Sequence, residues 1–225
     1  MAIGALQRNI PMKTSFGFFY AMMLITSMFT VQSSALELSL GGRIGVNIAS
    51  IIGDTTFGVA PKAGLTGGVF ATLWLNSSYF LQPELVLGLK GETPAGNNDV
   101  INAAFATNLS YFEIPVVCGW KILSKDQFQA SIFAGLTPAF ILSAESVYGG
   151  GSIDMTDQTQ SFDCGLTGGA TICLKRNKAI IPIDIRYTYG TVRFDKGNNN
   201  PLHNSVVSLT VGFGSEIKMK KEESF

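Results

Sequence analysis

The fold of this chain is decided by the stretch Leu36-Glu37-Leu38-Ser39-Leu40-Gly41-Gly42-Arg43-Ile44-Gly45-Val46-Asn47-Ile48. Its even positions are apolar apart from Gly42, and its odd positions are Glu, Ser, Gly, Arg, Gly and Asn. Strict alternation of this kind puts the apolar side chains on one face of a β-strand and the polar side chains on the other. The same two-residue rhythm recurs along most of the remaining sequence, so strands are expected throughout.

The rhythm divides the chain into eight predicted strands, near residues 36–49, 62–75, 79–90, 109–122, 127–144, 161–174, 179–193 and 204–217. Their connections alternate in length. Those at 76–78, 123–126 and 175–178 are tight and polar, whereas those at 50–61, 91–108, 145–160 and 194–203 are long. Short turns at one end and long loops at the other are typical of outer-membrane barrels. The sequence therefore predicts an all-β fold, an eight-stranded antiparallel transmembrane up-and-down β-barrel.

Composition indicates which face of each strand points outward. Only 14% of residues are charged, against roughly 25% in soluble domains. A water-facing exterior would be rich in Lys and Glu, whereas the polar face here is mostly Gly, Ser, Thr and Asn. Such a face suits the crowded interior of a narrow barrel, so we expect the apolar face to meet lipid. A periplasmic lipocalin-like binder, which would bury the apolar face, is the soluble alternative.

Residues 1–35 resemble an export signal. Lys13 supplies positive charge, residues 16–29 are mostly apolar, and Ser33-Ser34-Ala35 offers small residues for cleavage. The apolar run is shorter than the roughly 20 residues of a membrane-spanning helix, and Met12 is a plausible true start. We therefore expect a signal peptide at 1–35, a barrel at 36–217 and a charged tail at 218–225. An exported apolar chain without spanning helices crosses a bilayer as a closed barrel.

Several charged residues fall on the predicted inward face. Buried charges must be paired and hydrogen-bonded, so we expect a lumen network of Arg and Lys with carboxylates that fills and stiffens the barrel. A polar path or gate for small solutes is the alternative. The predicted lumen charge network comprises Arg43, Glu84, Lys90, Glu113, Asp184 and Arg186.

Aromatic residues near the predicted strand ends fit the girdles that form at membrane interfaces. The predicted girdle comprises Tyr79, Tyr111, Trp120, Tyr187 and Tyr189.

The residues offer no convincing catalytic or metal site. His203 is the only histidine, and Ser205 lies two positions later on the same strand face. A histidine and a serine are the residues that a lipid-modifying barrel enzyme would use. Their spacing in the sequence does not by itself establish a catalytic geometry. Cys118, Cys164 and Cys173 match no metal motif. We therefore expect no enzyme, no metal and no cofactor.

Six motifs, in order, resemble the PorT-type outer-membrane β-barrel family, a group of small barrels. Residues 42–47 resemble its opening strand, Leu81-Gln82-Pro83-Glu84-Leu85 its L-Q-P-E-L strand, and residues 109–115 its Y-L-E-I-P segment. Residues 134–138, 163–166 and 185–190 are similar to its later strands. The resemblance covers most of the chain after residue 35. It implies the barrel fold and an outer-membrane location, and it implies little about activity.

The expected role is structural or interactive, with a plugged polar lumen and exposed loops. A narrow, porin-like channel for small solutes is the first alternative. The expected partners are outer-membrane lipid, the barrel-assembly machinery, which would read Phe213 or Phe225, and an extracellular ligand or host molecule at the loops. The charges balance, with 16 basic and 16 acidic residues, and no basic stripe indicates nucleic acid. A monomer is expected.

Overall fold

The computed structural model describes residues 37–52, 59–94, 106–148, 151–158, 161–192 and 203–218. The predicted signal peptide at 1–35 lies outside the described residues, as do residues 219–225 of the predicted tail.

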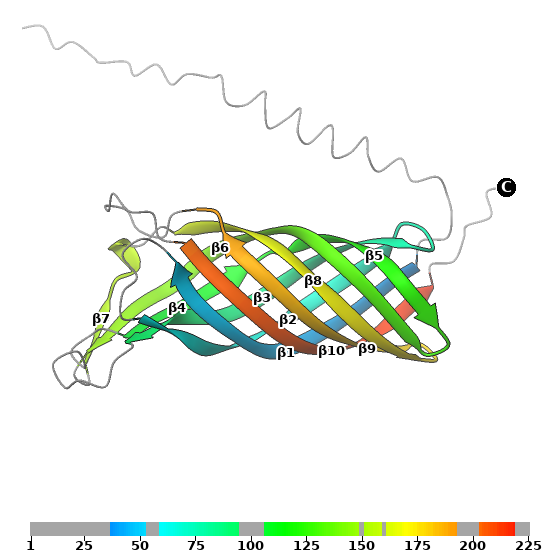
Figure 1. The fold of residues 1–225 in the computed structure, drawn as a ribbon, viewed down its shortest axis with the longest axis horizontal. Helices are drawn as coiled ribbons and strands as arrows, with labels where there is room; N and C mark the ends of the chain where they lie inside the picture. The colour runs from blue at the N-terminus through cyan, green and yellow to red at the C-terminus, as the bar shows by residue number, and fades with distance from the viewer. Residues whose placement is uncertain are drawn as a thin grey trace, which may run out of the picture. The chain divides into compact units, whose positions relative to one another are not determined.

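The described strands form one antiparallel ring. In chain order they are β1 (Glu37–Ile52), β2 (Val59–Trp74), β3 (Tyr79–Pro94), β4 (Ala106–Glu113), β5 (Val116–Lys125), β6 (Phe128–Tyr148), β7 (Gly151–Asp154), β8 (Phe162–Arg176), β9 (Ala179–Gly190) and β10 (His203–Lys218). β1 pairs with β10 along its whole length, from Glu37↔Lys218 to Ile52↔His203, and with β2 on its other edge. The strands wrap around a common axis with a strong tilt (Figure 1).

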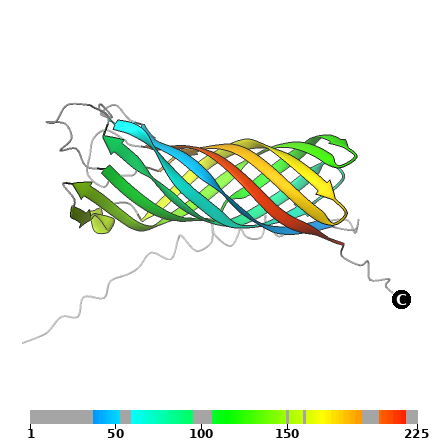
Figure 2. The same ribbon diagram turned by 90° about the horizontal axis from the view of Figure 1, so that it is seen from below.

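The ring has eight positions among the described residues, because β4 and β5 together occupy one of them between β3 and β6. β7 lies off the ring and pairs only with β6. The predicted eight-stranded antiparallel barrel is confirmed. The view in Figure 2 shows the same closed arrangement from another side.

The alternation places side chains as the sequence predicts. In β1, Arg43 and Asn47 are buried inside the ring, whereas Ile44 is 74% exposed on its outer wall. Outward positions from Leu38 to Ile48 are apolar apart from Gly42, and this length matches the roughly 9–11 residues with which a tilted strand crosses a bilayer. An outer wall of apolar side chains contradicts the lipocalin-like alternative.

Pro115 divides the strand predicted at 109–122. Proline has no N–H for the ladder, and residues 114 and 115 lie between β4 and β5. Residues 114 and 115 still form backbone hydrogen bonds with both neighbouring strands. The Glu84 N–H donates to the Pro115 carbonyl at 2.8 Å, and the Ile114 N–H donates to the Pro138 carbonyl at 2.8 Å. The wall is therefore continuous across the break.

The predicted long loop at 145–160 contains regular structure among its described residues. β6 continues to Tyr148, β7 pairs with it from Glu145↔Asp154 to Tyr148↔Gly151, and a short 3-10 helix, η1 (Thr156–Gln158), follows. At the opposite end the turns are tight. Asp126 and Asn177 have φ values of 48° and 56° there, in the left-handed region that Asp and Asn tolerate best after glycine.

Three phenylalanines fill the interior toward the short-turn end, each opposite a glycine. Phe70 pairs with Gly41, Phe80 with Gly119, and Phe133 with both Gly119 and Gly169. A Cβ on Gly119 would lie 2.0 Å from the Phe80 ring, and one on Gly41 would lie 2.5 Å from the Phe70 ring. These glycines therefore give the inward rings the space they occupy.

Candidate functional site

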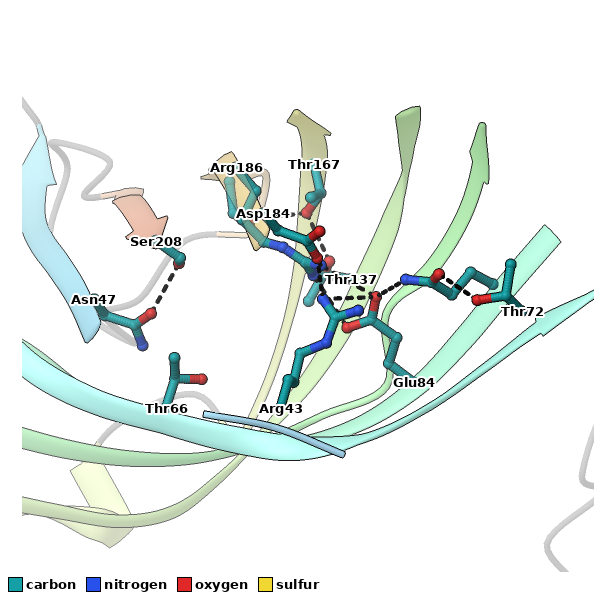
Figure 3. Close-up of polar contacts among 12 residues, drawn as sticks. Arg43, Asn47, Thr66, Thr72, Glu84, Thr137, Thr167, Asp184, Arg186 and Ser208 are labelled. Carbon is teal, nitrogen blue, oxygen red and sulfur yellow. Dashed lines mark hydrogen bonds and ion pairs between the residues drawn. The ribbon is translucent and has the colours of Figure 1, made fainter. Parts of the chain in front are cut away.

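Four charged side chains from three strands meet in the middle of the barrel. Arg43 comes from β1, Glu84 from β3, and Asp184 and Arg186 from β9. All four point inward because they sit at alternate positions on strands with apolar outer faces. They are all buried, and their formal charges cancel. We call these four residues the central cluster (Figure 3).

The two arginines of the central cluster each bridge both carboxylates. Arg43 Nη1 lies 2.5 Å from Asp184 Oδ2 and 3.4 Å from Glu84 Oε1. Arg186 contacts Glu84 through both Nη atoms, at 3.1 and 3.2 Å, and donates to Asp184 at 3.1 Å. A forked guanidinium suits this double contact, whereas a lysine ammonium would not reproduce it. The arrangement joins strands from different sides of the lumen.

Neighbouring polar and aromatic side chains extend the central cluster. Gln82 donates to Glu84 Oε1 at 2.7 Å and accepts from the Thr72 hydroxyl at 2.7 Å. The guanidinium of Arg43 lies 4.7 Å from the centre of the Phe70 ring, and that of Arg186 lies 5.2 Å from the Phe133 ring. Cation–π contact and charge-assisted hydrogen bonds stabilise the terminal nitrogens of both guanidinium groups, whereas Arg43 Nε and Arg186 Nε are buried with no hydrogen-bond partner among the described residues.

The other two residues of the predicted lumen network form a separate pair. Lys90 and Glu113 are buried and joined by an ion pair, and Lys90 Nζ also lies 4.4 Å from the centre of the Tyr111 ring. The structure therefore brings all six predicted charges into the lumen, but as a group of four and a group of two.

Tyr111 is not a girdle residue, so that interpretation is wrong. Its side chain is 1% exposed and lies inside the barrel. Residues two apart share a face of a strand, and Glu113 points inward, so Tyr111 points inward as well. Its hydroxyl accepts a hydrogen bond from Asn204 Nδ2 at 3.0 Å, and the same nitrogen donates to Asp163 Oδ2 at 3.1 Å.

The remaining girdle residues lie on the outer wall. Tyr79 and Trp120 are exposed, sit opposite each other on β3 and β5 near the short turns, and stack with ring centres 6.5 Å apart. Tyr187 is exposed and Tyr189 is half-buried toward the other end of the barrel. The four rings thus lie at two levels of the outer wall, and their role as interfacial belts stays a prediction.

Two cavities lie on opposite sides of the central cluster and share no lining residue. One, of about 40 Å³, faces the short turns and is lined by Ser39, Thr72, Gln82, Gln129 and Lys175 among others. The other, of about 20 Å³, reaches Arg43, Glu84 and Arg186 from the far side and extends to Lys90 and Glu113. Each has room for at least one water molecule. The central cluster and its phenylalanines therefore divide the lumen.

His203 and Ser205 do not form a catalytic pair in this structure. His203 Nδ1 lies 2.9 Å from the Gly190 carbonyl oxygen, and the Ser205 hydroxyl donates to the Tyr187 hydroxyl at 3.1 Å. Among the described residues, no group of three or more His, Cys, Asp and Glu side chains could hold a metal ion. The same residues contain no helix long and apolar enough to cross a membrane.

Some lumen residues were not predicted from the sequence. Gln82 lies two positions before Glu84, and Tyr111 lies two positions before Glu113, so the strand period carries a signal for both. Thr137, Thr167 and Thr188 form a hydrogen-bonded row with Oγ1 distances of 2.6 and 2.9 Å. These three threonines lie on β6, β8 and β9 and meet only because of the register in which these strands pair. No local pattern in the sequence could therefore have predicted their contact.

Comparisons with known proteins identify one family and several similar solved structures. The family described as "Outer membrane protein beta-barrel domain" matches residues 31–191. Among solved structures, outer membrane protein OprG from Pseudomonas aeruginosa is 11% identical, with a TM-score of 0.52 over 83% of this chain and 97% of that chain. Neisserial surface protein A is 13% identical, with a TM-score of 0.46 over 80% and 96%. A search of curated proteins found no match.

Proposed function

Because the chain belongs to the family of outer membrane β-barrel domains, we propose that it is a closed barrel whose activity lies in its extracellular connections rather than in its lumen. In this proposal the short turns face the periplasm and the long connections face outward, as in other outer-membrane barrels. The role is structural or interactive, through a ligand or a host molecule bound at the loops. Membership of the PorT-type group is a finer proposal of the same kind.

The observation that carries this proposal is the central cluster. Two arginines and two carboxylates are bonded across the interior from β1, β3 and β9. Breaking such a set leaves buried charges without partners, which costs several kcal/mol. Phenylalanine rings lie against both guanidinium groups and fill the lumen beside them. A solute would have to separate these contacts before it could pass.

Planar-bilayer recording tests the closed lumen. The folded chain 36–225 should insert without steady current, and its mobility on an unboiled gel should differ from that of the boiled sample because a closed barrel resists detergent. The double variant Glu84→Ala/Asp184→Ala, which removes both carboxylates and their volume, should conduct in the same bilayer. Steady current through the wild-type chain would refute the closed lumen.

A narrow channel is the second candidate, and the two cavities favour it. They lie on the two sides of the central cluster and its phenylalanines, so a combined rearrangement of the charged side chains and the phenylalanine rings would join them. Wild-type currents that appear in brief steps and disappear in Arg43→Lys, which loses the forked contact, would support a gated channel. A lipid-modifying activity is tested separately by lipid turnover in His203→Ala.

A further inference from the structure

The outer wall changes character where β9, β10 and β1 approach the long connections. Ile48, Ile185 and Val207 are exposed and apolar. Beyond them, the next outward positions on the same three strands carry hydroxyl, phenol and imidazole groups. We call these five residues the rim patch: Ser50, Tyr187, Tyr189, His203 and Ser205.

Two rings of the rim patch form a flat stack. The Tyr189 and His203 ring centres are 5.5 Å apart and their planes differ by 23°. His203 Nδ1 lies 2.9 Å from the Gly190 carbonyl oxygen, which can only accept, so Nδ1 carries the proton. This bond fixes the imidazole orientation and leaves Nε2 as the ring nitrogen that can bond an outside group.

The hydroxyls of the rim patch lie beside this stack. Ser205 pairs with Ser50 on one side and with Tyr189 on the other, and its hydroxyl donates to the Tyr187 hydroxyl at 3.1 Å. The next residue in this row, on β8, is Leu166, which is 55% exposed. On the β8 side, the rim patch therefore borders directly on an apolar part of the wall.

The chemistry of the rim patch suits a sugar. Hydroxyl and phenol groups donate and accept hydrogen bonds, and the aromatic faces can cover the C–H faces of a pyranose ring. None of the five side chains carries a charge when His203 is neutral, so the patch offers little to a bare phosphate. The exposed apolar wall below it continues directly to Ile48 and Val207.

We propose that the rim patch binds the sugar headgroup of a glycolipid in the outer leaflet, whose acyl chains lie along the apolar wall below. Continuity with the lipid-facing wall favours a membrane glycolipid over a free saccharide, since one molecule would cover both surfaces. The proposal rests on the outer-membrane location and is independent of whether the lumen is closed. Conductance therefore neither supports nor refutes it.

The test is binding of purified rough-type lipopolysaccharide to the folded chain in detergent micelles, measured as the temperature at which the folded gel band is lost. Lipopolysaccharide should raise this temperature for the wild-type chain at lower concentrations than phosphatidylglycerol. Tyr189→Leu removes the stack, and at least tenfold more lipopolysaccharide should then be needed. Tyr79→Leu, the matched aromatic control at the short-turn end, should respond like the wild type.

Ser205→Ala keeps the ring stack and serves as a second variant if Tyr189→Leu does not fold. It should require severalfold more lipopolysaccharide than the wild type. Equal responses of the rim-patch variants and Tyr79→Leu would overturn the proposal. So would an equal effect of phosphatidylglycerol, or of core oligosaccharide freed of its acyl chains.

Discussion

At the scale of single residues, the two arginines of the central cluster differ in how many contacts each supplies. Arg186 reaches Glu84 through two nitrogens and also reaches Asp184, whereas Arg43 makes one short and one longer contact. Arg186→Ala leaves two buried carboxylates with one guanidinium, so we expect it to lower the free energy of unfolding by about 3–5 kcal/mol. Arg43→Ala should have the same sign and a smaller effect. Urea titration followed by tryptophan fluorescence in micelles measures both.

The control for this prediction restores the charge balance of the central cluster. Asp184→Asn added to Arg186→Ala leaves one guanidinium and one carboxylate, and the double variant should unfold at a higher urea concentration than Arg186→Ala alone. If the two variants unfold together, packing of the arginine stem rather than charge is the cause.

The inward position of each lumen charge could be predicted from the sequence, because a strand period of two decides the face. The partners could not. Arg43 and Glu84 lie on strands that are both paired with β2, and their contact depends on the radius of the ring. The outward placement predicted for Tyr111 is wrong because nearness to the strand end does not decide the face of the strand. Tyr111 lies two residues before the inward Glu113, so its side chain also points inward.

At the scale of elements, the pairing of phenylalanine with glycine fixes how β3, β5 and β6 pack. Gly119 faces inward between Phe80 and Phe133, and its absent Cβ would lie 2.0 Å from the Phe80 ring. Gly119→Ala should therefore destabilise the barrel by about 1–3 kcal/mol through overpacking. Gly168→Ala is the matched control, because the nearest atom to its Cβ is 3.8 Å away. Equal unfolding midpoints for the two variants would contradict this packing.

The β6–β7 hairpin, which extends from the barrel, is held by Thr156. Its hydroxyl accepts from the Ala144 N–H at 3.1 Å, and its N–H donates to Asp154 Oδ1 at 2.8 Å. Hydrogen bonds from the Thr156 hydroxyl and N–H hold the pKa of Asp154 below its ordinary value. Thr156→Val keeps the N–H and loses the hydroxyl, so the pKa of Asp154 should rise part of the way back.

Carboxyl NMR titration of Asp154 measures this effect. A lowered pKa in the folded state stabilises the hairpin above the unfolded pKa, and this stabilisation is lost as the pH falls through the folded pKa. Protection of the Ala144 amide, taken relative to the intrinsic exchange rate at each pH, should therefore fall in acid for the wild-type chain, and should already be low at neutral pH for Thr156→Val. An unchanged Asp154 titration in the variant would show that the hydroxyl bond is absent in solution.

Most strands could be predicted because each repeats the two-residue alternation. Two features could not, the break at Pro115 and the short strand β7, and each has a local physical cause. Pro115 removes one ladder donor and divides a strand that hydropathy presents as continuous. β7 is four exposed residues with a single large apolar side chain, Ile153, so no alternation marks it. Its pairing with β6, from Glu145↔Asp154 to Tyr148↔Gly151, therefore had no hydropathy signal.

At the scale of the whole molecule, closure of the ring turns every apolar strand face outward. The pairing of β1 with β10 over sixteen residues leaves neither strand with an open edge, and a closed ring satisfies its backbone without water. The sequence contains the outward apolar faces and the alternating connection lengths. No local pattern in the sequence shows that the ring closes, because closure requires the first and last strands to pair in register.

The outer wall then predicts how the cost of a charge depends on depth. Ile44 lies in the middle of the outward face of β1, and Ile52 lies on the same face at the end of the strand. In a bilayer, Ile44→Arg should lower the free energy of unfolding by about 2–4 kcal/mol, and Ile52→Arg by about 0–1 kcal/mol. Reversible unfolding in phospholipid vesicles measures both values. Both isoleucines are exposed, so a wall that faced water would tolerate arginine equally well at the two positions. A small cost at Ile44 would therefore contradict the lipid-facing wall, whereas a cost that falls from Ile44 to Ile52 places the bilayer around the middle of β1.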